Sequence, residues 1–517
     1  MATRMRLIQS DDWCPTAATN GRDFMYNTKF VEKLSVKKLE FLFAHEICHA
    51  IFDHFGRCGS RDRMLANIAQ DYAVNQILVD ERIGEKITEV KICYDAKYRG
   101  MAWEEIYDLL YEKAEKISMP DLLKQLGDLL DEHIKEEESA GADGDKTKDG
   151  KGKPSLTKEE AEALRDQARR FLEERSGREK ARAVMESGAS HDATLWAEIV
   201  GLGWTALRIP EEHGGLGLSM LELCVLAEEV GRVVSPVPFT SSVLLATEAL
   251  IAAGTDAQQS AWLPKLADGS AIGAVALAEG TGAPGVSSRL NIKDGKANGV
   301  KLPVQDALAA DIIILSGQDG LYLLETKAPG VTIEAVETID LVRRSARVTL
   351  KDAPVTPLSG GRAALEKFLQ SAAILLAFEG LGGADAAMDM ALTYSKDRVA
   401  FGRKIAGYQA VKHRLADMYI KNQLARSHAY YGAWALLTDA PELVQAAAGA
   451  RLAAMDAFQF AAEENVQLHG GIGFTWESDC QFYYRRARLL TLALGAKSHW
   501  ADVLVRSLEQ RNTMMAG

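Results

Sequence analysis

Apolar residues recur at helical spacing on both sides of a short interruption near residue 400. They lie three or four positions apart, at Leu381, Ala384, Met388 and Leu392 before it and at Val411, Leu415 and Met418 after it. This spacing places the side chains on one face of a helix. Phe401-Gly402 and Gly407 stand in the interruption, and glycine commonly ends such a pattern. The pattern predicts two helices joined by a tight corner.

The period of the pattern changes between residues 271 and 362. Short apolar or alternating runs, typical of strands, occur at residues 272–279, 290–292, 312–315, 321–324, 331–336 and 346–350. Asp294-Gly and Asn298-Gly are hairpin signals. We therefore predict a small β-domain at residues 271–362, between helical domains at residues 155–270 and 363–517.

The first 135 residues predict a separate, mainly helical segment. Residues 1–30 show no regular pattern and are expected to be irregular. A helix is predicted from Ser35, as N-cap, to Phe55, because Gly56 follows as a stop. A second is predicted at residues 61–79 and a third, increasingly charged, at residues 104–138. The second helix carries a polar stripe at i, i+4 and i+8, formed by Asn67, Asp71 and Asn75.

Residues 136–154 contain almost no apolar side chains. Such a stretch cannot bury enough surface to fold, so we predict a flexible linker between two independent parts. The alternative is a solvated loop inside one domain. It is less favoured, because unstructured loops of this length are uncommon in compact domains.

Composition narrows the class of protein. The 517 residues are 47% hydrophobic and carry a net charge of −12, which disfavours nucleic-acid binding because that requires a basic face. Six cysteines without a C-x-x-C pair indicate a reducing cytoplasm rather than a disulfide framework. Residues 1–13 lack an apolar signal core. No run reaches the ~20 apolar residues of a membrane span.

The first long helix contains His45-Glu46-Ile-Cys-His49. Histidines at i and i+4 share one helix face and can bind one Zn²⁺, and Glu46 could then take a proton from a metal-bound water. The alternative is a surface helix that happens to carry these residues. A third ligand is needed, and His54 lies about 140° round the helix from His49. Asp71, the acid of the polar stripe, is the better candidate.

The sequence around these residues resembles a metallopeptidase-like family of phages and bacteria, over residues 5–130. The resemblance rests on the HExxH helix, the run from Asn67 to Asn75, Tyr94-Asp and the run from Gly100 to Tyr107. It implies a zincin-like fold and a zinc-dependent hydrolase. The ligand role of Asp71 is our own inference.

The corner near residue 400 carries Arg398, Arg403 and Lys404 beside Phe401 and the Gln409 amide. Fixed cations beside an aromatic ring suit a ligand with phosphates and a flat ring. The alternative is a polar elbow in a helical bundle. The run Gln467-Leu-His-Gly470-Gly471-Ile-Gly holds three glycines in four residues, which lets backbone N–H groups approach an anion.

These two stretches together resemble the C-terminal domain of the acyl-CoA dehydrogenase family, whose patterns are R-x-x-F-G-x-x-I-x-x-x-Q and Q-x-H-G-G-x-G. Pro210-Glu-Glu-His-Gly-Gly-Leu-Gly217 matches another turn of that family, and the resemblance covers residues 155–510. It implies FAD, an acyl-CoA substrate, an electron-transfer acceptor protein and a homo- or hetero-oligomer. By the same resemblance, Arg398, Phe401, Gln409, Gln467, Gly470 and Gly471 bind the cofactor.

The chain departs from that family where chemistry is expected. A flavin-facing hydroxyl is replaced by Ala278, and the run from Lys301 to Val304 lacks an aromatic residue. The resemblance places the catalytic base at one of two positions, which here hold Leu494 and Ala372. Glu379 could be a displaced base, although an isolated carboxylate is more often a surface residue.

Three functions follow from this pattern. The first is an FAD-dependent acyl-CoA dehydrogenase, with or without its own base. The second is a zinc metallopeptidase with the flavin-type part as a passenger. The third is a non-catalytic flavin-binding subunit of a heteromer. Residues 471–477 are similar to bacterial branches of the family that pair a base-less subunit with a competent one, including branches that act on bulky or steroid-type acyl-CoAs.

Overall fold

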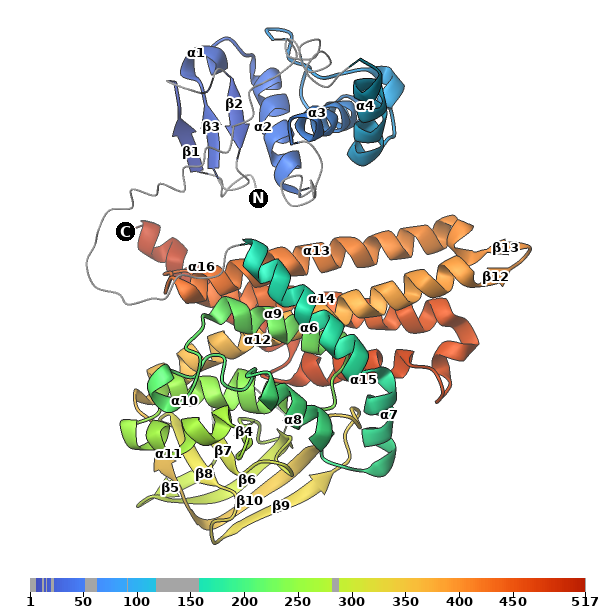
Figure 1. Cartoon of the computed structure of the whole chain (residues 1–517). Coiled ribbons are helices and arrows are strands. Elements are labelled where there is room, and N and C mark those ends of the chain that lie inside the picture. The colour runs from blue at the N-terminus through green and yellow to red at the C-terminus, as the bar shows by residue number, and fades with distance from the viewer. Residues whose placement is uncertain are drawn as a thin grey trace. The chain divides into compact units, whose positions relative to one another are not determined.

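The computed structural model describes residues 6–11, 14, 16–19, 23–51, 63–90, 92–117, 158–280 and 288–516. The chain divides into two compact units, Met1–Asp149 and Gly150–Gly517, each drawn as a separate body in Figure 1. The predicted linker at residues 136–154 lies outside the described residues.

The described residues of the first unit form a small sheet and four α-helices. Strands β1 (Arg6–Gln9), β2 (Ala17–Thr19) and β3 (Asp23–Tyr26) pair in the order β1-β3-β2, with β1 parallel and β2 antiparallel to β3. The irregular start predicted for residues 1–30 is therefore wrong. Strands of three or four residues are too short for their alternation to be recognised, since the pattern needs four to eight positions.

The helices of this unit are α1 (Thr28–Val31), α2 (Val36–Ile51), α3 (Arg63–Asp80) and α4 (Trp103–Ile117), with a 3₁₀ turn, η2, at Ala96–Tyr98. Ser35 caps α2 as predicted, because its Oγ accepts the Lys38 N–H at 3.3 Å. The predicted continuation of the first and third helices, and His54, lie outside the described residues.

Helix α3 is the centre of the first unit. One face carries Val74 and Leu78, which pack with Phe41 of α2 and Phe24 of β3 in a buried apolar cluster. Its other face carries Leu65 and Ile68 and packs on Trp103 and Ile106 of α4. Because both faces are covered, polar side chains on α3 that point toward α2 are held in a dry, fixed environment.

The second unit begins with helices that span the predicted region 155–270. They are α6 (Lys158–Arg175), α7 (Arg178–Ser187), α8 (Ala193–Gly201), η4 (Glu211–His213), α9 (Met220–Arg232), η5 (Thr240–Thr247), α10 (Glu248–Ala253) and α11 (Asp256–Ala267). Side chains of Asp192, Ser219 and Thr255 cap α8, α9 and α11.

Helix α6 is fixed to the second unit by charged contacts. Arg165 Nη2 lies 3.2 Å from Glu228 Oε2 and 2.6 Å from the Tyr430 hydroxyl, and Arg169 donates twice to Glu229, at 2.8 and 2.9 Å. Glu228 and Glu229 are buried. These contacts join α6 to α9 and to helix α13, described below.

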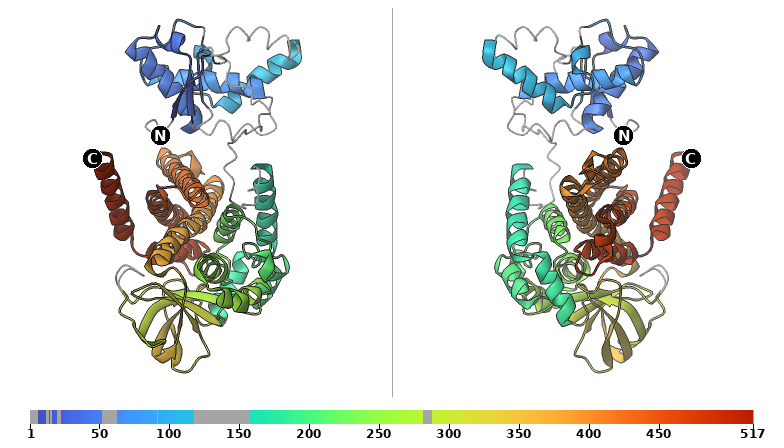
Figure 2. Two further views of the ribbon diagram at one scale, coloured as in Figure 1. Left: turned by 90° about the vertical axis from the view of Figure 1, so that its left-hand side faces the viewer. Right: turned by 90° about the vertical axis from the view of Figure 1, so that its right-hand side faces the viewer.

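The predicted β-domain is confirmed as two four-stranded sheets, ordered β5-β6-β10-β9 and β11-β8-β7-β4. The strands are β4 (Gly273–Ala276), β5 (Asn291–Lys293), β6 (Lys296–Gln305), β7 (Ile312–Ser316), β8 (Leu321–Glu325), β9 (Val331–Val336), β10 (Ser345–Pro354) and β11 (Thr356–Pro357). Figure 2 shows the two sheets at one end of the unit. Buried side chains of both, including Ile313, Leu324 and Val348, form one cluster.

The two hairpin signals in this domain have different outcomes. Asp294 and Gly295 form the turn between β5 and β6, with φ of 51° and 72°, as predicted. Asn298-Gly299 instead lies inside β6, where Asn298 pairs with Asn291. The strand continues through this dipeptide because β10 pairs with it on the other side, so long-range pairing overrides the local turn preference.

The last domain is a bundle of long helices, α12 (Gly361–Asp397), α13 (Gln409–Leu437), α14 (Leu443–His469), α15 (Cys480–Leu492) and α16 (Lys497–Ala516). The predicted corner is a short hairpin, β12 (Val399–Ala400) and β13 (Arg403–Lys404), followed by the 3₁₀ turn η6 (Ile405–Gly407), at the far end of α12 and α13 in Figure 1. Phe401 and Gly402 take φ of 52° and 81° to turn the chain.

Among the described helices, α12 alone is long and apolar enough to cross a membrane. However, 83% of its most apolar 18-residue window is buried inside the protein. It contacts α9, α13, α14 and α15. Its apolar character therefore matches its place as the core helix of the bundle.

Candidate functional site

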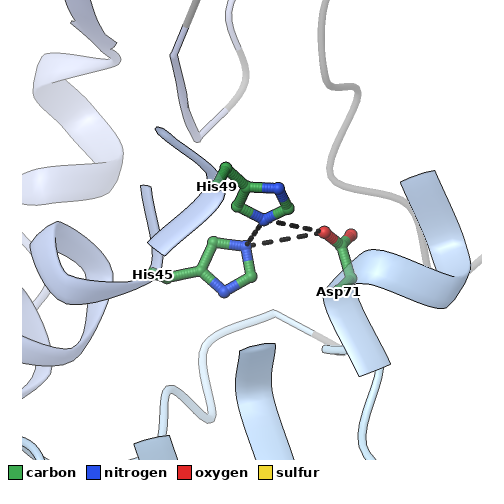
Figure 3. Close-up of side chains that lie close together, drawn as sticks. All are labelled: His45, His49 and Asp71. Carbon is green, nitrogen blue, oxygen red and sulfur yellow. Dashed lines mark hydrogen bonds and ion pairs between the residues drawn. The ribbon is translucent and has the colours of Figure 1, made fainter. Parts of the chain in front are cut away.

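Helices α2 and α3 bring three potential metal ligands together in the first unit (Figure 3). His49 Nε2 lies 3.1 Å from His45 Nε2 and 3.2 Å from Asp71 Oδ1, and His45 Nε2 lies 3.6 Å from the same oxygen. All three residues are buried. Asp71 of the predicted polar stripe on α3 therefore faces the two histidines. Asn67 of the same stripe is only half-buried.

The geometry of these three atoms fits zinc. Zinc binds histidine nitrogen and carboxylate oxygen at ~2.0–2.2 Å in a tetrahedron, which puts neighbouring ligand atoms about 3.3 Å apart. The observed separations of 3.1, 3.2 and 3.6 Å bracket this value. Three protein ligands leave the fourth position to a water or a substrate, as in catalytic sites.

Glu46 is also buried, at 1% exposure, one residue after His45 on α2. The HExxH residues are therefore buried and do not lie on an exposed helix face. Phe41, Leu42, Ile87 and Ile92 line a small pocket that His45, Asp71 and Asn75 also border. The site thus has a polar floor and apolar walls.

In the second unit, three of the predicted cofactor-binding residues lie on the hairpin and at its edges. Arg398 follows α12 and is exposed, Phe401 lies at the hairpin tip and is 96% exposed, and Gln409 begins α13. The hairpin is held by Tyr408, whose hydroxyl donates to Ala400 O at 3.0 Å. The corner thus presents a cation and an aromatic ring to the outside.

The glycine-rich run ends helix α14 at the same end of the bundle. Gln467 is exposed near the end of α14, and Gly470 and Gly471 open the 3₁₀ turn η7 (Gly470–Phe474). A Cβ at either glycine would meet no atom within 4 Å, so this backbone is open to a ligand. The ring of Tyr394, at the end of α12, stacks on His469 with 4.1 Å between ring centroids. The two sequence motifs are therefore joined, and their residues fit a phosphate-bearing cofactor.

Glu379 is not a surface residue, contrary to the alternative favoured by the sequence. It is 0% exposed, and its carboxylate accepts hydrogen bonds from Arg343 Nη2 at 2.6 Å, Thr240 Oγ1 at 3.0 Å and Arg486 Nη1 at 3.3 Å. Burial raises its pKa, but attraction to Arg343 and Arg486 and the hydrogen bonds outweigh burial and lower the pKa below the usual value. Its oxygens are engaged by these buried partners.

The two positions expected for a base are apolar and buried. Leu494 is 7% exposed and follows α15 with φ of 59°, and Ala372 of α12 is 1% exposed. The Leu494 carbonyl accepts the Trp500 Nε1–H at 2.9 Å. Both side chains belong to the main apolar core, so neither position offers a proton acceptor.

Some buried polar residues were not foreseen from the sequence. Lys301 is 0% exposed and its ammonium lies 2.6 Å from Glu279, and Arg486 pairs with Asp340 at 2.6 Å. Isolated charged residues give no periodic signal, and their partners lie 22 to 146 residues away. In the first unit, the contact between Asn75 and His45 was missed as well.

Comparison with known families finds one match in the N-terminal part of the chain and two matches in the second unit. Residues 158–270 match "Acyl-CoA dehydrogenase, N-terminal domain", and residues 359–508 match "Acyl-CoA dehydrogenase, C-terminal domain". Residues 1–197 match "Putative metallopeptidase domain". The last match runs through α6, which packs in the second unit.

Individual relatives agree with these matches. Acyl-CoA dehydrogenase IpdE2 of Mycobacterium tuberculosis is 35% identical over 334 residues, which cover 64% of this chain and 91% of the relative. Acyl-CoA dehydrogenase FadE34 of the same organism is 31% identical over 316 residues, covering 61% of this chain and 42% of that protein. A solved structure titled "Tcur3481-Tcur3483 steroid ACAD G363A variant" is 30% identical, with a TM-score of 0.64, and the match covers 69% of this chain and 99% of that one.

The residues matched by the two acyl-CoA dehydrogenase domains include both motif stretches and most of the helical bundle. The chain therefore belongs to the acyl-CoA dehydrogenase family of oxidoreductases and carries a metallopeptidase-like domain at its N-terminal end.

Proposed function

We propose that the second unit binds FAD and takes part in the α,β-dehydrogenation of an acyl-CoA thioester without supplying the catalytic base. When bound, FAD would accept a hydride from the β-carbon of the substrate. Arg398 would bind the cofactor phosphates, Phe401 would pack on its rings, Gln409 would hydrogen-bond its polar edge, and Gln467, Gly470 and Gly471 would offer an open polar backbone. Family membership supports FAD, and the exposed corner supports these assignments.

One observation supports the absence of a catalytic base: the two positions expected for it hold Leu494 and Ala372, which are buried in the apolar core. Proton removal at the α-carbon needs a positioned base, and general base catalysis contributes ~10²–10⁴-fold. The pKa of Glu379 is lowered, but the two arginines that lower it also hold its carboxylate. We therefore infer that turnover requires a second, base-bearing subunit of the same family, and an electron-transfer protein as the acceptor.

The substrate we favour is a bulky acyl-CoA of steroid type. The proposal rests on the 30% identical structure, which is described as a "steroid ACAD". Cys48, Cys224 and Cys480 are free thiols, which supports a cytoplasmic location.

Absorbance of the purified chain tests this proposal. The protein should carry a flavin spectrum and be reduced by dithionite, while acyl-CoAs of several sizes should bleach it slower, by ~10²–10⁴-fold, than they bleach a base-bearing relative. Rapid bleaching of the chain alone would show that another residue serves as the base. A protein without flavin would overturn the cofactor assignment.

A second function is supported by the ligand triangle of the first unit. We propose that His45, His49 and Asp71 bind Zn²⁺ and that Glu46 acts as general base in hydrolysis of a peptide bond. Zinc would lower the pKa of a bound water. Elemental analysis after growth with added zinc should find one zinc per chain, and His45→Ala should lose it. The matched control is His413→Ala, an exposed histidine of α13, which should retain the metal.

A further inference from the structure

Asn75 joins a metal-ligand candidate to the backbone of a distant loop. Its Nδ2 donates to the Cys93 carbonyl at 3.1 Å, and its Oδ1 lies 2.9 Å from His45 Nδ1. All three residues are buried. The loop that carries Cys93 is anchored on α2 through Lys38, whose ammonium lies 2.8 Å from Glu89.

These contacts determine where the His45 proton lies. A backbone carbonyl only accepts hydrogen bonds, so the Asn75 atom that faces Cys93 O must be the NH₂ group. The other amide atom, the carbonyl oxygen, then faces His45 Nδ1. Because that oxygen also only accepts, Nδ1 must carry the proton, and the neutral ring keeps a lone pair on Nε2.

The lone pair on Nε2 points to the place where a metal is proposed. His45 Nε2 lies 3.1 Å from His49 Nε2 and 3.6 Å from Asp71 Oδ1. Asp71 and Asn75 are one turn apart on α3, and both are buried. One helix thus supplies a ligand and the group that orients a second ligand on α2.

We propose that Asn75 is a positioning residue for the zinc site: it fixes the tautomer and ring orientation of His45 and so raises metal affinity. This inference rests on the proposed zinc binding by His45, His49 and Asp71. Orienting partners of metal-bound histidines typically contribute 10–100-fold to metal affinity. The sequence placed Asn75 on the correct helix face but gave it no role.

The test measures the zinc dissociation constant of the full chain by competition with a chromophoric chelator. Asn75→Leu removes both hydrogen bonds with little change in size, and zinc should bind about 10–100-fold more weakly. Asn75→Asp keeps an acceptor oxygen toward His45 Nδ1 and should retain most of the zinc affinity that Asn75→Leu loses, because a carboxylate also accepts the ring N–H. Gln76→Leu is the matched control. Gln76 is the next residue on α3, is buried, and its Oε1 has no hydrogen-bond partner among the described residues.

The outcomes separate this inference from the proposed zinc site. If the wild type binds no zinc, the zinc site itself fails. If the wild type binds zinc and Asn75→Leu binds it equally well, only the role of Asn75 is overturned. Equal weakening in Asn75→Leu and Asn75→Asp would also overturn it, because loss of the Cys93 contact would then be the cause. If Asn75→Leu does not fold, Asn75→Ser replaces it in the comparison.

Discussion

Replacement of Glu379 by glutamine should destabilise the second unit strongly. The substitution keeps the shape of the side chain but removes its charge, while Arg343 and Arg486 stay buried at 3% and 0% exposure. Breaking a buried ion pair by removing one partner costs ~3–5 kcal/mol, because the other charge is left uncompensated. Arg486 keeps Asp340 at 2.6 Å, so we expect a loss near the lower end, about 3 kcal/mol.

The assay is urea unfolding of the full chain, followed through the transition of the second unit. Glu198→Gln is the matched control, since Glu198 pairs with Arg175 at the surface, where the side chains are 26% and 54% exposed. Exposed pairs contribute ~0–1 kcal/mol, so this control should lose less than about 1 kcal/mol. Equal losses in the two variants would refute the reasoning.

The destabilisation caused by Glu379→Gln should also depend on pH. Burial raises the pKa of Glu379, but Arg343 and Arg486 hold the folded-state value below the usual one. A lowered pKa contributes stability above the unfolded-state pKa of ~4.3, and this contribution is lost as pH falls toward the folded-state value. The difference in unfolding free energy between wild type and Glu379→Gln should therefore be constant above about pH 5 and shrink below about pH 4. Unchanged stability together with a further loss of flavin bleaching by acyl-CoA would instead identify Glu379 as the base.

Three further predictions concern the proposed functions and the linker. Arg398→Ala should lower the flavin-to-protein ratio, because a charge-assisted hydrogen-bond set contributes ~1.5–3 kcal/mol; an unchanged ratio would exclude this phosphate contact. Leu494→Glu should speed flavin bleaching by a suitable acyl-CoA, by up to ~10²–10⁴-fold, and no gain in a folded, flavin-bound variant would count against base placement at this turn. Limited proteolysis should cut first at residues 136–154 and leave two folded pieces, whereas protection of this stretch would contradict an independent linker.

Elements whose signals are local could be predicted from the sequence. The helical repeat and the glycine break near Phe401 predicted α12, a tight corner and α13, and Asp294-Gly295 predicted the β5–β6 turn. HExxH spacing and the stripe on α3 foretold the cluster of His45, His49 and Asp71. In each case the determining interactions lie within about four residues, or follow from the helical period.

Features that depend on distant partners could not be predicted. Asn298-Gly299 has the sequence of a turn, yet pairing with β10 keeps it in a strand. Glu379 has the sequence context of a surface carboxylate, yet Arg343 and Arg486 arrive from segments 36 and 107 residues away. The strands of the first unit could not be predicted, because none of the three is longer than four residues and a strand pattern needs at least four positions.

The ion pairs that join α6 to α9 limit where the gene can be divided. A shortened gene that begins after residue 197, where the metallopeptidase-family match ends, would delete Arg165 and Arg169. Glu229, which is 1% exposed, would then lose both cations that pair with it, and an uncompensated buried charge costs several kcal/mol. The two halves of this protein can therefore be expressed apart only if the cut falls upstream of Lys158.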